Sequence, residues 1–307
     1  MYRNAYVLLL LTALFWGGNA VSGKLAVGHV SPMLLTAMRW GFAVAILGLI
    51  GWPRLVVDWP VARKHVPLLF GLGALGFTLF NAALYSALNH TSAINASIEQ
   101  AGIPMVIFAA NFILFRIKVT IVQVLGFLLS LTGIALTASH GDLSTLVKLD
   151  MNFGDALMLI AVLVYSGYTV ALRFKPDIHW QSLMIVLTGS AFVMSIPFVI
   201  WEYAAGRLIA PDPTGWALAA YIVIFPSIIA QIFYIRGVEL IGANRAGLFI
   251  NMVPIFGTIL SVLIIGEDFQ LYHAVAFALV LGGIWLAEHS GRKMAARQQR
   301  ELGYLPD

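Results

Sequence analysis

The sequence predicts an all-α membrane protein with ten transmembrane helices, arranged as two inverted five-helix repeats around a central cavity. Three observations support this fold class. The chain is 60% hydrophobic and only 10% charged, with a mean hydropathy of +0.90, whereas a soluble domain carries roughly 25% charged residues. Its apolar residues gather in ten runs of about 20 residues, the length that a bilayer core demands. The third observation is an internal repeat.

The apolar runs define the predicted helices and the division of the chain. We expect helices near 6–27, 33–52, 66–88, 93–115, 119–139, 154–174, 180–202, 215–236, 243–265 and 270–289. The first run is longer than the apolar core of an export signal and has no cleavage site, so we expect it to be retained. We divide the chain into a first repeat at 5–139, an inter-repeat loop at 140–153, an inverted second repeat at 154–289 and a basic tail at 290–307.

The repeat is clearest around two prolines, Pro104 and Pro254, which lie 150 residues apart. In that register Phe80–Ala138 aligns with Ala230–Glu288 without a gap, and an offset of 149 aligns Trp16 with Tyr165. Each repeat holds five predicted spans, an odd number, so the second copy enters the membrane upside down relative to the first. Inverted repeats of this kind are typical of transporters that work by alternating access.

The distribution of Lys and Arg predicts the orientation. If the N-terminus is cytoplasmic, fourteen of the eighteen basic residues lie on the inner side, Arg39 lies within a helix, and only Lys24, Lys148 and Arg207 lie outside. This bias predicts that both termini are cytoplasmic. The net charge of +4 then reflects topology, and we expect the basic tail to be a cytoplasmic anchor with no nucleic-acid partner. There are no cysteines, so neither a disulfide nor a thiolate metal site can form, and we expect no cofactor and no metal.

Polar side chains within the spans mark the predicted pathway, because such residues face the protein interior or a cavity. We expect the following to bind substrate: Trp16, Asn19, Thr78, Asn81, Tyr85, Asn95, Glu99, Tyr165, Tyr168, Gln231, Tyr234 and Asn251. Asn19 and Asn81 could instead join helices by hydrogen bonds. Four tryptophans near span ends are interpreted as interfacial anchors, namely Trp52, Trp59, Trp180 and Trp216.

Two charged residues lie within the spans. Arg39 and Glu99 are each six residues from the outer end of a span, which is about 9 Å deep. They could form a structural ion pair, or they could bind the two ends of a zwitterion. We assign Arg39 as a structural charge and Glu99 as the group that binds a substrate ammonium, with a proton as the other candidate ligand of Glu99.

Pro104 and Pro254 have a mechanical interpretation. A proline within a helix removes one backbone hydrogen bond and kinks the helix. Equivalent prolines in both copies, each within about one helical turn of polar residues, favour a pair of hinges, although static packing is the alternative.

The motif Trp16-Gly-Gly-Asn19, with Lys24, Pro32 and Arg39, resembles the opening of EamA-type proteins of the drug/metabolite transporter superfamily. Ile265-Gly-Glu267 and Leu281-Gly-Gly-Ile284 resemble the last helix pair of that family. The resemblance spans about 5–290. It implies a ten-helix exporter in the bacterial inner membrane, with cytoplasmic termini and a cavity lined by helices 1, 3, 4, 6, 8 and 9. Arg116 departs from the pattern, since the family has an acidic residue after helix 4.

Within that family the chain looks most like the bacterial amino-acid exporters, aromatic ones included. We therefore expect a non-enzymatic exporter of amino acids and related metabolites that works in the bilayer, as a monomer or as a dimer. An exporter of purines, nucleosides or cationic drugs is the main alternative. A sugar-phosphate carrier would require several basic residues deep in the cavity. An intramembrane enzyme would require a catalytic motif that the sequence lacks, and a channel is disfavoured by the inverted, interrupted helices.

Overall fold

The computed structural model describes residues 4–116, 120–142, 152–241 and 246–301. All regular secondary structure within these ranges is helical. The predicted inter-repeat loop at 140–153 and the end of the basic tail therefore lie mostly outside the described residues. Seven helical runs in the described part are long and apolar enough to cross a membrane, and two further apolar runs, Phe249–Ile265 and Leu271–Ala287, are shorter.

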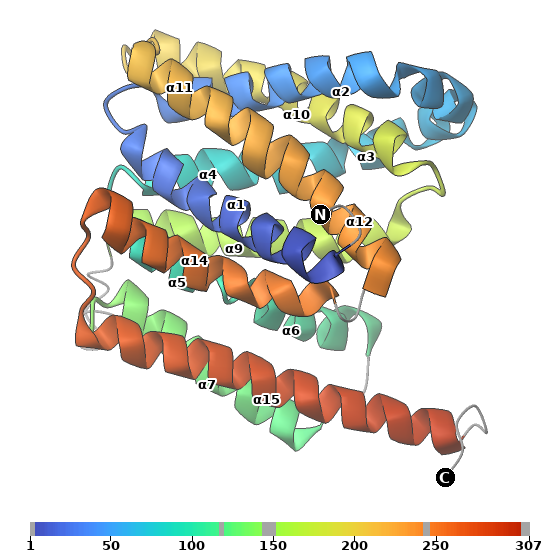
Figure 1. Ribbon diagram of the computed structural model, residues 1–307, viewed down its shortest axis with the longest axis vertical. Helices are drawn as coiled ribbons and strands as arrows, with labels where there is room; N and C mark the ends of the chain where they lie inside the picture. The colour runs from blue at the N-terminus through green and yellow to red at the C-terminus, as the bar shows by residue number, and fades with distance from the viewer. Residues whose placement is uncertain (1–3, 117–119, 143–151, 242–245, 302–307) are drawn as a thin grey trace.

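The helices of the first half follow the predicted spans closely. They are α1 (Ala5–Leu25), α2 (Pro32–Ala62), α3 (Val66–Gly73), the π-helix η2 (Ala74–Leu79), α4 (Phe80–Ala87), α5 (Ala93–Gln100), α6 (Ile103–Phe115) and α7 (Ile121–Ala138). A short 3-10 segment, η1 (Arg63–His65), lies where the chain turns back, so that α2 and α4 pack against each other (Figure 1). Helix α2 extends about ten residues past its predicted end.

The second half contains matching helices. They are α9 (Phe153–Ala171), the 3-10 segment η3 (Leu172–Phe174), α10 (Trp180–Ala204), α11 (Pro213–Ile222), the π-helix η4 (Val223–Ile229), α12 (Ala230–Ile241), the 3-10 segment η5 (Gly247–Met252), α14 (Val253–Leu260), the π-helix η6 (Ser261–Ile265) and α15 (Leu271–Glu301).

Several helices begin where a polar side chain satisfies the first backbone N–H groups. Asn4, Ser92, Asn152 and Asp212 each accept a hydrogen bond from the first turn that follows them, and Thr120 forms a capping box with Gln123. Caps of this kind supply partners that the helix itself cannot provide. In the loop before α11, the Gly215 N–H and then His29 hold the pKa of Asp212 below its usual range.

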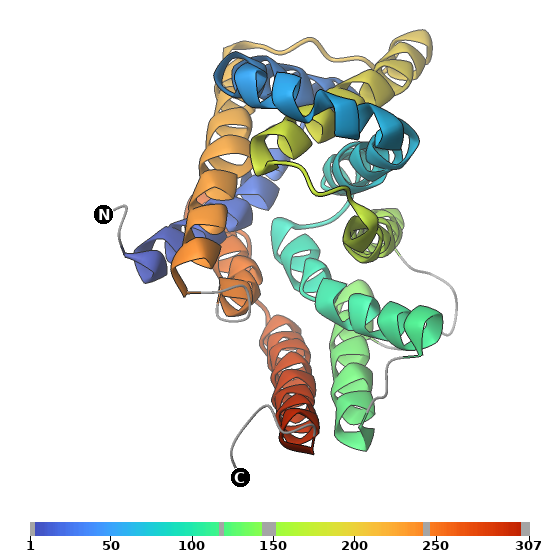
Figure 2. The same cartoon turned by 90° about the vertical axis from the view of Figure 1, so that its right-hand side faces the viewer.

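The two halves pack against each other in an exchanged pattern. Helix α1 packs against α12 and α14 of the second half, while α9, its counterpart by sequence register, packs against α4 and α6 of the first half. Helix α2 packs against α10, and α7 packs against α15 at the opposite end of the molecule (Figures 1 and 2). Each half therefore completes the packing of the other.

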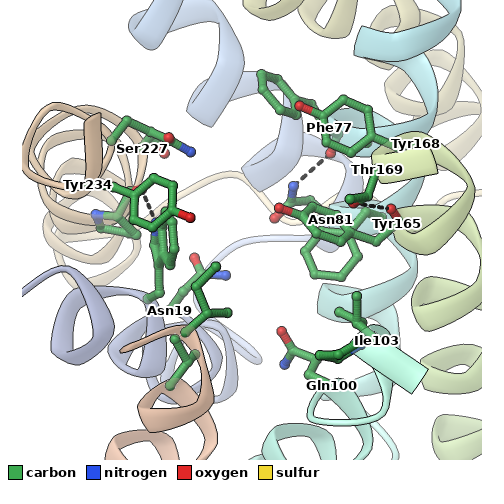
Figure 3. A pocket seen from close by; sticks show the side chains of 18 of the residues that line it. Asn19, Phe77, Asn81, Gln100, Ile103, Tyr165, Tyr168, Thr169, Ser227 and Tyr234 are labelled. Carbon is green, nitrogen blue, oxygen red and sulfur yellow. Dashed lines mark hydrogen bonds between the residues drawn. The ribbon is translucent and has the colours of Figure 1, made fainter. Parts of the chain in front are cut away.

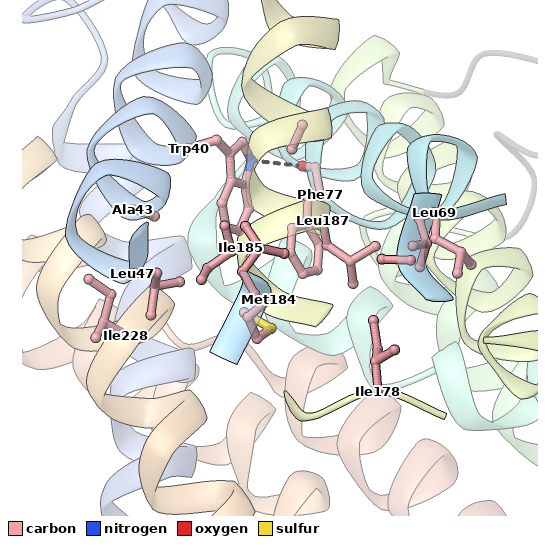
Figure 4. Packing of buried hydrophobic residues seen from close by; sticks show 14 of the residues in the cluster. Trp40, Ala43, Leu47, Leu69, Phe77, Ile178, Met184, Ile185, Leu187 and Ile228 are labelled. Atoms are coloured by element: carbon pink, nitrogen blue, oxygen red, sulfur yellow. Dashed lines mark hydrogen bonds between the residues drawn. The ribbon is translucent and has the colours of Figure 1, made fainter. Parts of the chain in front are cut away.

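A buried cluster joins α2, α3 and α10 beside the polar centre of the molecule (Figure 4). Trp40 stacks on Phe77 with ring centroids 4.5 Å apart, and its Nε1 donates a hydrogen bond to the Phe77 carbonyl at 3.2 Å. Leu69, Leu187 and Ala191 in the same cluster are almost fully buried. This packing holds the π-helix η2 in place, which matters because η2 borders the site described below.

The contact between α7 and α15 is close because of small residues. A Cβ at Gly126 would lie 2.5 Å from the Gly283 carbonyl oxygen and 3.0 Å from the Ala287 nitrogen. The Ser130 hydroxyl also donates to the Val280 carbonyl at 3.0 Å across this contact. In a membrane, such contacts replace the hydrophobic effect as the force that joins helices.

We expect Gly126→Ala to lower the melting temperature of the purified protein in detergent, because the added methyl group must push α7 and α15 apart. Overpacking of this kind costs about 1–3 kcal/mol. Gly48→Ala is the matched control, since a Cβ at Gly48 of α2 meets nothing within 4 Å and alanine is the better helix former. Equal melting temperatures for the two variants would contradict the proposed role of Gly126.

Candidate functional site

A cavity of about 550 Å³ lies between the two halves, within the range of small-molecule sites. It is lined by α1, α2, η2, α4, α5 and α6 from the first half and by α9, α10, η4, α12, η5 and α14 from the second. Figure 3 shows Asn19, Ser227 and Tyr234 on one side, facing Phe77, Tyr165 and Tyr168 on the other. Both repeats are therefore needed to form the cavity.

Aromatic rings form two walls of the cavity. On one wall Trp16 of α1 lies against Tyr234 of α12, with ring centroids 5.4 Å apart. On the other, Tyr165 of α9 lies 4.8 Å from Phe80 and 5.4 Å from Tyr168. Rings at such distances and tilts are favourable contacts. They also offer faces on which a planar or aromatic ligand could stack.

The polar lining consists mainly of amides. Asn19, Asn81, Gln100, Gln231 and Asn251 line the cavity. Arg39 is the only charged side chain among the described residues that line it. The cavity therefore combines aromatic walls, groups that both donate and accept hydrogen bonds, and one positive charge.

Arg39 is held by neutral groups alone. Its Nη1 donates to Asn19 Oδ1 at 2.7 Å, to Asn81 Oδ1 at 2.9 Å and to Tyr85 Oη at 2.6 Å. The side chain is 6% exposed, and its Nε has no hydrogen-bond partner among the described residues. No ion pair found in the described part of the chain includes Arg39. The ion pair with Glu99 that the sequence left open is thus not formed in this conformation.

Two π-helical segments border the cavity at equivalent places. η2 ends at Leu79 and η4 ends at Ile229, 150 residues apart. A π-helix changes the register of backbone hydrogen bonds, and such segments are frequent at functional sites. The Phe77 carbonyl of η2 accepts from Asn81 Nδ2 at 2.6 Å as well as from Trp40, and the Pro226 carbonyl of η4 accepts from Trp16 Nε1 at 3.0 Å. These hydrogen bonds fix the positions of the Asn81, Trp40 and Trp16 side chains in the cavity lining.

The structure alters the interpretation of the two prolines. Pro104 is the second residue of α6 and Pro254 the second residue of α14. The backbone N–H groups in the first turn of a helix have no acceptor within the helix, so a proline there removes no helical hydrogen bond. Each predicted span is therefore interrupted just before its proline, by the turn at Ala101–Gly102 in one half and by the 3-10 segment η5 in the other. Both prolines line the cavity.

Eight predicted substrate residues line the cavity, and these are Trp16, Asn19, Asn81, Tyr165, Tyr168, Gln231, Tyr234 and Asn251. The other four do not. Thr78 donates to the Ala191 carbonyl at 2.7 Å. The Tyr85 hydroxyl accepts a hydrogen bond from Arg39 but does not itself line the cavity. Asn95 and Glu99 face away from the cavity. The reason for the last two is helical geometry, because Gln100, one residue later and rotated by about 100°, takes the position in the lining.

Some lining residues were missed by the sequence analysis. Gln100 is polar and adjacent to the predicted hinge, so its position next to Glu99 carried a usable signal. Phe77 and Phe80 are apolar residues in an apolar span, and nothing in the sequence separates them from residues that face lipid. Pro226 was also overlooked, although a proline inside a predicted span signals an irregular helix.

The two matching halves are also found when the chain is compared with known proteins. A profile of the EamA-like transporter family matches residues 3–139 and again residues 152–288. The chain belongs to the EamA-like transporter family. EamA-like proteins are membrane transporters and not enzymes, which agrees with the expectation from the sequence.

Several relatives of this EamA-like protein extend over nearly its whole length. The "Uncharacterized transporter YyaM" of Bacillus subtilis is 25% identical over 93% of this chain and 94% of its own, and the "Uncharacterized transporter YetK" of the same organism is 26% identical over 92% and 86%. The "Uncharacterized inner membrane transporter YicL" of Salmonella typhimurium is 22% identical over 95% and 98%. A crystal structure with a TM-score of 0.63 and 22% identity covers 94% of this chain and 98% of its own, and shows the same fold.

Polar contacts close the end of the EamA-like cavity that lies beyond Arg39. Lys24 Nζ at the end of α1 donates to the carbonyls of Leu88 at 2.9 Å and Thr91 at 2.7 Å. Glu267, after η6, accepts from the Ala93 and Ile94 N–H groups at 2.8 and 2.9 Å. A carboxylate at a helix N-terminus is stabilising, so Glu267 ties the second half to the start of α5.

We expect Glu267→Gln to loosen this closure, because a neutral amide oxygen cannot replace both interactions of the carboxylate with α5. The chain has no cysteine, so Ala93→Cys provides a unique reporter at a position that is fully buried here. Maleimide labelling of the purified reporter protein should become several-fold faster when Glu267→Gln is added. Asp268→Asn, which changes the neighbouring carboxylate, is the control, and equal labelling rates in both backgrounds would contradict the role of Glu267.

Proposed function

We propose that the protein exports amino acids, aromatic ones included, across the bacterial inner membrane by alternating access. The observation that carries the proposal is a buried guanidinium with no carboxylate partner among the residues that the structure describes, located in a cavity with aromatic walls. A buried charge without a counter-charge is costly in a membrane protein. An anionic group on the substrate would supply the missing partner.

In this proposal Arg39 binds the substrate carboxylate, rather than acting only as a structural charge. Charge-assisted hydrogen bonds from arginine to a carboxylate are among the strongest polar contacts. The side chain of the substrate would stack between Trp16 and Tyr165. The amide oxygens of Gln100, Gln231 and Asn251 would accept hydrogen bonds from the substrate ammonium, because Glu99 is outside the lining.

The alternatives differ in how well they suit this lining. A cationic drug would place its charge near Arg39 with no acidic side chain among the described lining residues to offset it. A purine or nucleoside remains the second candidate, because five amide side chains can match the donors and acceptors on the edge of a base. A single guanidinium can neutralise only one of the two negative charges of a sugar phosphate.

The proposal includes ten transmembrane helices in two inverted repeats, with both termini in the cytoplasm. The bias of basic residues toward one side supports that orientation. Helix α1 contacts α12 and α14, whereas its counterpart α9 contacts α4 and α6, which correspond to α12 and α14 in the first half. This exchange supports the inversion. The two halves of the chain together form the cavity lining, so we propose that a monomer suffices.

The shape of the cavity fits loading from the cytoplasm. Its lining extends to Leu172 and Met184, next to the loop between α9 and α10, which the proposed topology puts inside. Lys24 and Glu267 close the opposite end. We therefore propose that this conformation faces the cytoplasm and accepts substrate there.

The test is uptake of labelled amino acids by proteoliposomes that contain the purified protein, compared with adenine and adenosine. We expect Arg39→Gln to weaken amino-acid binding roughly tenfold to a hundredfold, since hydrogen bonds to charged groups contribute about 1.5–3 kcal/mol. Arg39→Lys should retain part of the affinity because it retains the charge.

Tyr85→Phe is the matched control, because it removes a hydrogen bond from Arg39 without removing the charge. It should lower stability and leave amino-acid affinity close to the wild-type value. Transport of purines with no transport of any amino acid would reject the proposal in favour of the second candidate. An unchanged amino-acid affinity in a folded Arg39→Gln variant would reject the assigned role of Arg39.

The proposal also keeps Pro104 and Pro254 as hinges, now at the junctions between helices. We expect Pro104→Ala and Pro254→Ala to slow transport several-fold while the affinity for substrate changes little, because alanine would let each interrupted span join into one helix. Transport rate and binding affinity would be measured separately on the same preparations. Pro197→Ala is the control, since Pro197 lies inside α10 and outside the cavity lining. Normal transport rates in both hinge variants would assign these prolines to packing.

A further inference from the structure

Glu99 is the most unusual ionisable group in the protein. It is fully buried, and neither carboxyl oxygen has a hydrogen-bond partner among the described residues. Helix α9, which packs against α5, carries another buried carboxyl group, that of Asp155. An ionised carboxylate with no donor and a negative neighbour is costly to bury. A proton on Glu99 would remove this cost.

A set of polar groups links Asp155 to the protein surface. Asp155 is fully buried, and it accepts a hydrogen bond from the Thr91 hydroxyl on one oxygen. Its other oxygen lies 3.6 Å from Nδ1 of His140, whose side chain is 47% exposed. His140 follows the end of α7, at the end of the molecule that the proposed topology places outside. Asp155 is thus within reach of protons from that side.

The hydrogen bonds also determine which nitrogen of each histidine carries a proton. The Gln270 N–H donates to His273 Nδ1 at 2.9 Å, so His273 Nε2 must be the donor to Asn95 Oδ1 at 3.1 Å. The Asn95 amide nitrogen then donates to His140 Nε2 at 3.3 Å. His140 therefore carries its proton on Nδ1, the nitrogen that faces Asp155.

Of the helices packed on α5, α14 carries no titratable group, and the titratable groups that lie near α5 come from the other segments around it. They are Lys24 of α1, His90 before α5, His140 after α7, Asp155 of α9, Glu267 after η6, and Tyr272 and His273 of α15. Lys24 and Glu267 are occupied by their contacts with backbone groups. His273 is fixed by hydrogen bonds on both nitrogens. Of the groups that remain, His140 is the one that lies against Asp155, so we consider His140, Asp155 and Glu99 as the groups that exchange a proton.

We infer that Glu99, Asp155 and His140 form a proton site separate from the substrate cavity, through which protons moving inward drive the proposed export. When the Asn95 amide turns away from His140 Nε2, that nitrogen takes a proton from the outer medium, the Nδ1 proton moves to Asp155, and Asp155 passes a proton on to Glu99. Glu99 directly precedes Gln100 and Ala101, which line the cavity at the break between α5 and α6. Movement at that break would turn Glu99 toward the cavity, where the proton leaves as substrate binds.

The inference rests on the proposed function, so the experiment measures substrate transport and proton coupling separately. Counterflow of labelled against unlabelled amino acid, with no pH gradient, reports substrate transport by the full-length protein in liposomes. Accumulation driven by an imposed pH gradient reports coupling. We expect Glu99→Gln to keep counterflow within about twofold of wild type and to lose pH-driven accumulation at least tenfold. His140→Gln should slow the response to the gradient several-fold without abolishing it.

Glu202→Gln is the matched control. Glu202 is also a buried carboxylate, but unlike Glu99 it accepts hydrogen bonds, from the Ser31 hydroxyl and from the Met33 and Leu34 N–H groups. This variant should lose stability and keep its response to the pH gradient. If wild-type protein shows no amino-acid counterflow, the proposed function fails.

Infrared spectroscopy then tests the proton site without any substrate. We expect purified wild-type protein to show the carbonyl stretch of a protonated carboxyl group near neutral pH, and Glu99→Gln to lack that band. An identical spectrum in the variant would overturn the inference. So would undiminished pH-driven accumulation by Glu99→Gln, or accumulation that follows a sodium gradient instead of a pH gradient.

Discussion

The hydrogen bonds of Arg39 are the interaction on which the centre of the molecule depends. One nitrogen of this guanidinium joins α2 to Asn19 of α1 and to Asn81 and Tyr85 of α4, and Tyr85 donates to Asn19 in turn. These contacts hold three helices together at one edge of the cavity. They satisfy donors without neutralising the charge, and a membrane interior penalises a charge far more than a satisfied dipole. The positive potential is therefore left available to a ligand.

The repeat explains why the cavity has irregular helices on both sides. Each half carries a π-helix and an interrupted helix at the same register, η2 with the break before Pro104, and η4 with the break before Pro254. Irregular backbone at membrane depth is tolerated where it is buried in protein or lines a cavity. Here the carbonyls of Phe77 and Pro226 bind tryptophan and asparagine side chains. The same irregularity therefore builds the wall and orients its side chains.

Much of the fold could be predicted because hydrophobic length is a strong signal in a membrane protein. The predicted ends of α1, α7, α9 and α10 lie within about three residues of the observed ones. Side-chain direction was harder to predict. In the span that contains Glu99, neighbouring residues point about 100° apart around the helix. Hydropathy does not give the rotation of a helix, so it could not show that Gln100 lines the cavity and Glu99 does not. The lining role of Phe77 and Phe80 also depends on the fold as a whole, because an apolar residue facing a cavity looks the same in sequence as one facing lipid.

The two buried charged groups behave differently because of where the helices end. Arg39 lies about two turns inside α2, and its guanidinium is held by side chains of α1 and α4, so its position is rigid. Glu99 lies one residue before the end of α5, next to a turn of two residues. A group at a helix end can be reoriented by small changes in backbone angles, whereas a group in mid-helix moves only with the whole helix. A fixed cation at the cavity and a movable carboxyl beside the break between α5 and α6 form an arrangement in which substrate binding and proton release can each favour the same movement of α5.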